Sequence, residues 1–190
     1  AAVILQCNAA DKLYSTLNSV DIWGHLRNIS MVDSINNQIK EISSFYNQYA
    51  DIFKRNTLFI SFHKVGFNNS SLLFSSNFKR QTISSNKEIN SLLGNLVAQT
   101  EYNNQPIFEL QYKGRTLFVS YKDDIVFFSE NKMLVEDAIR ASVAEEKLTS
   151  NPSFNTAYKT IKKSEEIQIH LFYNYNSVFE YTNLFTNKPI

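Results

Sequence analysis

Glycine, proline and cysteine are scarce in this chain of 190 residues, which has 4 glycines, 3 prolines and a single cysteine. A nucleotide-binding loop clusters its glycines so that backbone N–H groups can approach phosphate closely. The glycines here stand alone, at positions 24, 66, 94 and 114. The composition therefore argues against a P-loop or a dinucleotide-binding fold, and the lone Cys7 excludes an intramolecular disulfide.

An excess of charge of one sign is also missing, since 19 Lys and Arg residues against 18 Asp and Glu residues give a formal net charge of +1. Non-specific binding to nucleic acid needs a broad positive field. Residues 112–122 interleave aromatic rings with Lys and Arg, as single-strand-binding proteins do, but no net basic face surrounds them. We therefore expect no nucleic-acid partner.

Long apolar runs are missing as well. No window approaches the roughly 18 consecutive apolar residues of a transmembrane helix. The chain begins without Met and stops abruptly after an apolar run, so we expect it to be a piece of a longer protein. Contact with a membrane is then expected only through an upstream anchor that is not in this chain.

What the chain does have is apolar material for one sizeable core, with 43% hydrophobic and 14% aromatic residues. Its patterning predicts a single α+β domain over residues 1–190, mainly helical at 1–55 and forming a sheet at 56–190. We expect a mostly antiparallel, multi-stranded sheet with the helices chiefly on one face and an N-terminal helical region. The expected strands are 2–6, 57–65, 71–78, 106–112, 116–122, 125–129 and 166–175, and the expected helices are 9–17, 21–54, 85–98, 132–144, 152–163 and one from 177.

An internal repeat links two of these strands. Residues 57–62 read TLFISF and residues 116–121 read TLFVSY, and each copy continues as turn, strand, Asn and helix. Chance similarity between β-rich segments is the other explanation. A true duplication predicts two hairpin-plus-helix repeats placed side by side in one antiparallel sheet.

Alternation along the strands separates the two faces of the expected sheet. One face is apolar, with Leu58, Ile60 and Phe62 as examples, and should lie under the helices. The other mixes polar with large apolar side chains, which a fully hydrated face would not need, so we expect it to be partly covered. This second face is our candidate interaction face, and its residues are Phe59, Ser61, His63, Leu73, Phe118, Ser120, His170 and Phe172.

Groups with reactive chemistry are few. His63 and His170 fall on one expected face and could share a metal or act as an acid–base couple, but no third ligand is visible, so ordinary polar-face roles are favoured. Cys7 has no basic neighbours to lower its pKa, which favours a buried, inert thiol. Carboxylate pairs fall in a turn or beside lysines at helix ends, as surface charge does. We predict no catalytic residue, no metal and no cofactor.

One stretch resembles a known family. The segments TLFVS (116–120) and VFFS (126–129) flank a tight turn, and Val135 and Asn151-Pro152 follow. In these residues the chain resembles uncharacterised cell-envelope proteins of Bacteroidetes, the domain of unknown function 3352. Such proteins look exported and anchored upstream, which implies a periplasmic or other extracytoplasmic location. Because that family is itself uncharacterised, the resemblance implies no functional residue.

These observations together favour a non-enzymatic extracytoplasmic domain. We expect it to present its polar–aromatic sheet face to another domain of the same longer chain or to a protein partner. A small-ligand-binding module, with its pocket between the sheet and the N-terminal helices, is the alternative. An enzyme ranks third and would need His63 and His170 within hydrogen-bond reach of each other or of a carboxylate.

Overall fold

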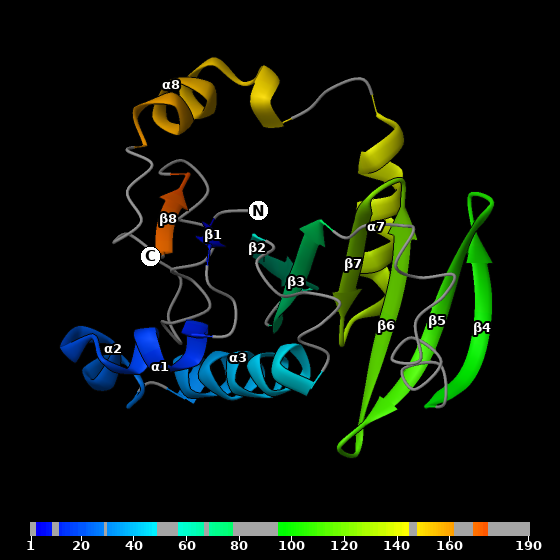
Figure 1. Ribbon diagram of the computed structural model, residues 1–190, viewed down its shortest axis with the longest axis horizontal. Helices are drawn as coiled ribbons and strands as arrows, with labels where there is room; N and C mark the ends of the chain where they lie inside the picture. Colours follow the sequence, from blue (N-terminus) through cyan, green and yellow to red (C-terminus); the bar gives the residue numbers. More distant parts are fainter. Residues whose placement is uncertain are drawn as a thin grey trace.

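Within the part of the chain that the structure describes, an antiparallel sheet of eight strands is accompanied by five α-helices (Figure 1). The computed structural model describes residues 3–8, 12–28, 30–48, 57–66, 69–77, 95–144, 148–161 and 169–174. The α+β class and the antiparallel sheet expected from the sequence are thereby confirmed. The strand order is β4-β5-β6-β7-β3-β2-β1-β8, so β4 and β8 form the two edges.

The elements follow one another along the chain as listed here. The strands are β1 (Val3–Cys7), β2 (Leu58–Val65), β3 (Asn69–Asn77), β4 (Leu96–Tyr102), β5 (Gln105–Tyr112), β6 (Arg115–Lys122), β7 (Ile125–Ser129) and β8 (Ile169–Tyr173). The α-helices are α1 (Leu13–Asn18), α2 (Asp21–Leu26), α3 (Ser30–Gln48), α7 (Lys132–Val143) and α8 (Pro152–Thr160), with a short 3₁₀ helix η2 (Leu148–Ser150) before α8.

Two hairpins occupy the centre of the sheet. β2 and β3 form one, β6 and β7 form the other, and they join where Phe74 of β3 lies opposite Phe128 of β7. The related segments 57–62 and 116–121 thus form the outer strands of adjacent hairpins. The duplication itself stays a prediction, because most of the helix expected after the first hairpin lies outside the described residues. The helix expected after the second hairpin is α7, which Asn131 caps by accepting a hydrogen bond from the Met133 N–H at 3.0 Å.

The predicted C-terminal end of the helix after the first hairpin is wrong. Residues 96–102 form strand β4, not the last part of a helix at 85–98, most of which lies outside the described residues. β4 joins β5 through Asn103 and Asn104, whose φ angles are 49° and 58°. A two-residue turn with both central φ angles positive matches the twist of an antiparallel hairpin, and Asn tolerates this conformation well.

The N-terminal helices cover one face of the sheet. The expected helical run at 21–54 is divided into α2 and α3, and Ile35, Ile39 and Ile42 of α3 are buried. They join Leu13 of α1 and the sheet residue Ile60 in the larger of two apolar clusters. The face predicted to lie under helices therefore does so, because its alternating apolar residues meet the apolar stripe of α3.

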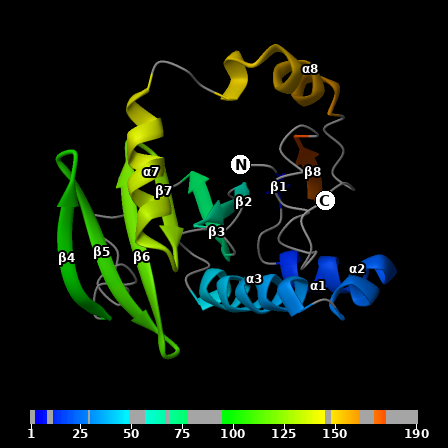
Figure 2. The same cartoon turned by 180° about the vertical axis from the view of Figure 1, so that it is seen from behind.

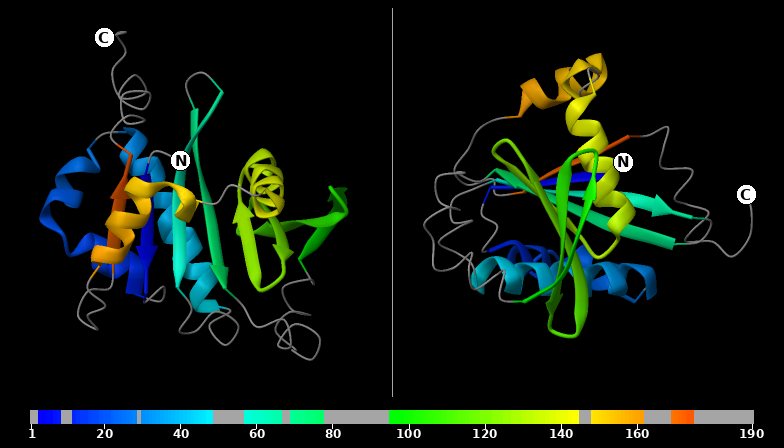
Figure 3. Two further views of the ribbon diagram at one scale, coloured as in Figure 1. Left: turned by 90° about the horizontal axis from the view of Figure 1, so that it is seen from above. Right: turned by 90° about the vertical axis from the view of Figure 1, so that its right-hand side faces the viewer.

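α7 packs on the opposite face. Val135 and Ile139 of α7 and Ile107 of β5 form the second apolar cluster, with Phe118 packed against it. Figure 3 shows α1–α3 on one side of the twisted sheet and α7 and α8 on the other. Helices chiefly on one face were expected, but α7 has an apolar stripe of its own and covers the other.

Two further expectations concern the chain ends. Asn151 and Pro152 do open a helix, since the Asn151 side chain accepts a hydrogen bond from the Phe154 N–H at 3.1 Å. The helix expected from residue 177 lies outside the described residues. Among the residues described, no helix has both the length and the apolar character needed to cross a membrane.

Candidate functional site

The eight residues of the candidate interaction face all lie on one side of the sheet, the side that carries α7. Strand pairing aligns Ser120, Phe127, Ser75, Phe59, Gln6 and His170 in one row across six strands. Because side chains alternate along each strand, residues two positions away in each strand share this side. We call this side the mixed face.

α7 covers one end of the mixed face. Phe118 packs against the cluster that Val135 and Ile139 form with Ile107. Ser120 is fully buried, and its hydroxyl donates a hydrogen bond to the Pro106 carbonyl at 2.7 Å. These two predicted residues are therefore engaged within the domain.

α8 covers the other end through aromatic rings. The Phe154 and Tyr158 rings of α8 lie 5.3 and 6.0 Å from the Phe172 ring of β8, centroid to centroid. The Phe154 and Tyr158 rings also stack on each other at 5.8 Å. Such ring pairs add specific attraction to the area they bury, so Phe172 too is held by the domain's own helix.

Between these two covers lies a strip on β2 and β3 that we call the central strip: Phe59, Ser61, His63 and Leu73. All four side chains are only partly buried. The strip combines two large apolar groups with a hydroxyl and an imidazole. His170, the remaining predicted residue, is partly buried on β8 in the same row as Phe59.

Ser61 and His63 form a hydrogen-bonded pair in the central strip. The Ser61 Oγ lies 2.7 Å from the His63 Nε2, and the Ser61 hydroxyl also donates to the Leu73 carbonyl at 3.3 Å. Burial lowers the pKa of His63 to about 4, while Asp137 of α7 acts in the opposite direction. His63 is therefore a neutral imidazole at pH 7, with one nitrogen that donates and one that accepts.

This pair has a chemical resemblance to the serine–histidine part of an acyl-transfer site, which also needs a carboxylate that orients the imidazole. Asp137 is the acidic residue that influences His63, but it forms its ion pair with Arg140, one turn along α7. The geometry present is that of a polar contact within a sheet face.

The structure does not bring the two histidines together. His170 lies in the row of Phe59, two strands from β2, and His63 lies four residues further along β2. With about 4.8 Å between strands and about 3.3 Å per residue, the two histidines are roughly 16 Å apart. The shared metal or acid–base couple is thus not formed, and the described residues contain no group of three or more His, Cys, Asp or Glu that could hold a metal ion.

Gln6 is a member of the mixed face that sequence reasoning missed. It lies between Phe59 and His170 in the row, is buried, and donates from Nε2 to the Asn8 Oδ1 at 3.1 Å. No alternation was visible in the short apolar run around it. Cys7, the next residue, is 1% exposed on the opposite face, as its prediction as a buried thiol required.

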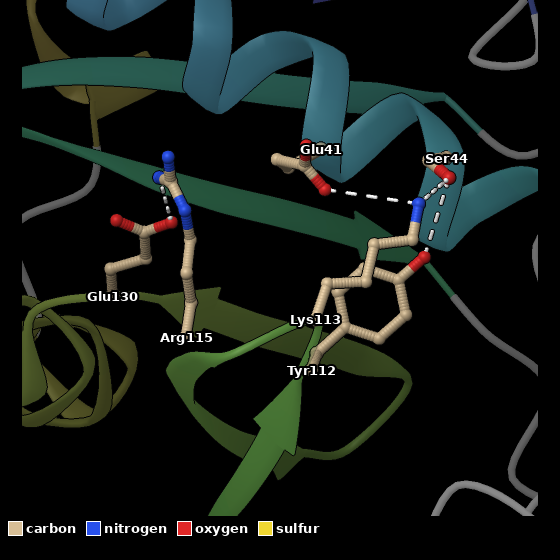
Figure 4. A network of polar contacts seen from close by, with 6 residues as sticks. All are labelled: Glu41, Ser44, Tyr112, Lys113, Arg115 and Glu130. Atoms are coloured by element: carbon tan, nitrogen blue, oxygen red, sulfur yellow. Dashed lines mark hydrogen bonds and ion pairs between the residues drawn. The ribbon is translucent and has the colours of Figure 1, made fainter.

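The stretch that interleaves rings with cations is occupied by internal contacts, as Figure 4 shows. The Lys113 Nζ donates to the Ser44 Oγ of α3 at 2.6 Å and lies 3.8 Å from the Glu41 Oε2. Arg115 pairs with Glu130 at 2.8 Å, and this hydrogen bond raises the pKa of the guanidinium further above its usual value. Both cations are paired with carboxylates, which weakens any attraction to phosphate.

Comparisons of the chain with protein-family models, with curated proteins and with solved structures found no match. The resemblance to the Bacteroidetes envelope family stays a prediction.

Proposed function

We propose that this protein is a non-enzymatic, extracytoplasmic interaction domain whose central strip binds another domain of the same longer chain or a protein partner. The observation that carries the proposal is the pair Phe59 and Leu73. Both are partly exposed, as Phe118 and Phe172 are, but those two pack against the α7 cluster and the α8 rings. An exposed apolar group flanked by satisfied polar groups is typical of a protein interface.

Comparison of the two hairpins supports this proposal. In the repeat, Phe59 corresponds to Phe118 and Ser61 to Ser120. α7 covers Phe118 and Ser120, so the duplication that we propose makes the central strip the equivalent position for a second helix. A partner that presents an amphipathic helix with β-branched side chains, as Val135 and Ile139 of α7 do, fits this position.

A partner can bury the polar members of the central strip at a low desolvation cost. Ser61 and His63 are already hydrogen-bonded to each other at 2.7 Å, and His63 is neutral at pH 7. Covering them requires no charge to leave water, and a buried charge without a partner is the most expensive group to cover. The strip is thus well suited to burial by a largely apolar partner.

The ligand-binding alternative placed its pocket between the sheet and the N-terminal helices. The larger apolar cluster occupies that interval, where Leu13, Ile39 and Ile60 are fully buried. Side chains packed at this density leave little room for a ligand without rearrangement. This packing favours the interaction domain over the ligand-binding module.

Site-specific photocrosslinking tests the proposal. A photoreactive amino acid replaces Leu73 in the full-length protein in its own cell, and Met133, exposed at 63% on α7, receives the same group as the control. We expect a discrete crosslinked product from position 73, to another part of the same chain or to one partner. Position 133 should give none. The proposal fails if both positions yield the same products or if position 73 yields none.

A further inference from the structure

The edge strand β8 exposes two apolar side chains on the face that the N-terminal helices cover. Leu171 is 61% exposed and Tyr173 is 65% exposed, whereas Leu5, directly opposite Leu171 on β1, is 5% exposed. Ile169, at the other end of β8, still packs against the core cluster. The apolar cover therefore reaches β8 only at Ile169 and leaves Leu171 and Tyr173 exposed.

β8 also lacks the devices by which edge strands avoid pairing with other chains. A charge, a proline or a bulge commonly blunts such an edge. β8 reads IHLFY, with no Lys, Arg, Asp, Glu or Pro. The opposite edge strand β4, in contrast, contains Glu101 and a shift of register between Leu96 and Ala98.

Further exposed apolar side chains lie at the same end of the molecule. In α2 and just before it, Ile22 is 66% exposed, Val20 is 44% and Leu26 is 39%. Figures 1 and 2 both show α2 and β8 at one end of the molecule, far from β4. Apolar surface gathered in this way marks an interaction site more often than a hydrated surface.

We propose that β8 pairs antiparallel with β8 of a second copy of this chain, about a two-fold axis at Leu171, so that one sheet continues through the dimer. Among the described residues β1 is the one strand neighbour of β8, so the outer row of backbone N–H and C=O groups can accept a further strand. This edge is separate from the central strip.

A second copy of the chain fits this edge because the side chains of β8 are complementary to those of another β8 in an antiparallel pair. Around Leu171 the antiparallel register places Ile169 opposite Tyr173 and His170 opposite Phe172. On one side of the sheet, apolar side chains then lie opposite apolar side chains, and on the other side the His170 and Phe172 rings lie opposite each other. No like charges lie opposite one another. A two-fold axis perpendicular to the sheet also keeps both α1–α3 layers on the same side, and isologous dimers of this kind are the commonest oligomers.

Sedimentation measurements on the intact chain test the pairing. A five-residue strand with a few flanking side chains gives a small interface, so we expect a reversible dimer with a Kd on the order of 10–100 µM. At the two-fold axis a single substitution places two identical charges opposite each other, so L171K and L171E should each raise the Kd about tenfold or more. Mixing L171K with L171E should restore a dimer, since Lys then faces Glu.

The matched control is V97K on the other edge, where Val97 is 59% exposed. It should dimerise as the unmodified chain does. Circular dichroism of each variant checks that the fold is kept, and the mixing experiment rescues association only if both variants are folded. The proposal is overturned if the unmodified chain stays monomeric at about 1 mM, if V97K dissociates the dimer while L171K does not, or if the mixture remains monomeric.

Discussion

Ser61 and Ser120 occupy equivalent places in the two hairpins, but Ser120 is fully buried under α7 whereas Ser61 is partly exposed and bonds His63. Each hydroxyl donates to a backbone carbonyl, Ser120 to Pro106 at 2.7 Å and Ser61 to Leu73 at 3.3 Å. The two hydroxyls thus bond different neighbours, Ser61 within its own hairpin and Ser120 to the adjacent strand β5, and they lie in two environments, one covered by the domain itself and one left open.

These environments predict different costs for the same substitution. S120A leaves the Pro106 carbonyl without its buried donor, and such a loss costs about 1–3 kcal/mol of unfolding free energy. S61A removes a longer bond at a partly hydrated site and should cost less than about 1 kcal/mol. Urea denaturation of both variants measures the difference, and equal losses would contradict the assignment of one covered and one open position.

His63 should make the stability of the domain depend on pH. Burial depresses its pKa to about 4 from an ordinary 6.5, so the unfolded chain binds more protons than the folded chain between these values. The contribution of the neutral His63 to the free energy of unfolding is complete above about pH 6.5 and is lost as the pH falls toward 4. Urea denaturation at several pH values should therefore show a smaller loss on acidification for H63Q than for the unmodified chain. An unchanged pH profile in H63Q would refute the depressed pKa.

The attachment of α3 to the sheet should depend on apolar packing more than on the network of Figure 4. Phe45 is 2% exposed, and its ring meets the Tyr112 ring edge-on at a centroid distance of 5.3 Å. F45A should cost about 3–5 kcal/mol, as loss of a buried ring does. K113A removes a half-exposed cation beside Glu41 and should cost less than about 1 kcal/mol. Thermal unfolding of the two variants would contradict this account if K113A were the more damaging.

The turn between β4 and β5 offers a stabilising substitution. Asn104 has a φ of 58°, a conformation that glycine adopts without steric cost. N104G should raise the free energy of unfolding by up to about 1 kcal/mol, whereas N104V should lower it, because a β-branched side chain is strained there. Chemical denaturation of both variants checks the sign, and a more stable N104V would rule out this turn.

The sequence predicted the fold best where one period was clear. Alternation in residues 57–65 and 116–122 identified both hairpins and their core face, and Asn131 and Asn151 marked helix starts correctly. β4 was missed because its residues, LVAQTEY, lack clean alternation, and its turn carries no glycine. A turn made by two asparagines was the one available signal.

Sequence reasoning placed the eight candidate residues on one face of the sheet but could not say which of them are open. Alternation fixes the side of the sheet on which Phe59 and Phe118 lie, but the cover depends on where α7 and α8 pack in three dimensions. The separation of His63 from His170 likewise depends on strand order, which period-two patterning does not specify. Gln6 lies on the mixed face for the same reason, because β1 pairs between β2 and β8.

The proposed function requires that Phe59 and Leu73 are covered in the native assembly. Hydroxyl-radical footprinting of the isolated chain and of the protein as it occurs in its own cell compares the oxidation of these two side chains, with Met133, 63% exposed on α7, as the internal control. We predict that oxidation of Phe59 and Leu73 falls at least several-fold in the cell while that of Met133 stays constant. Equal oxidation of Phe59 and Leu73 in both settings would contradict the account.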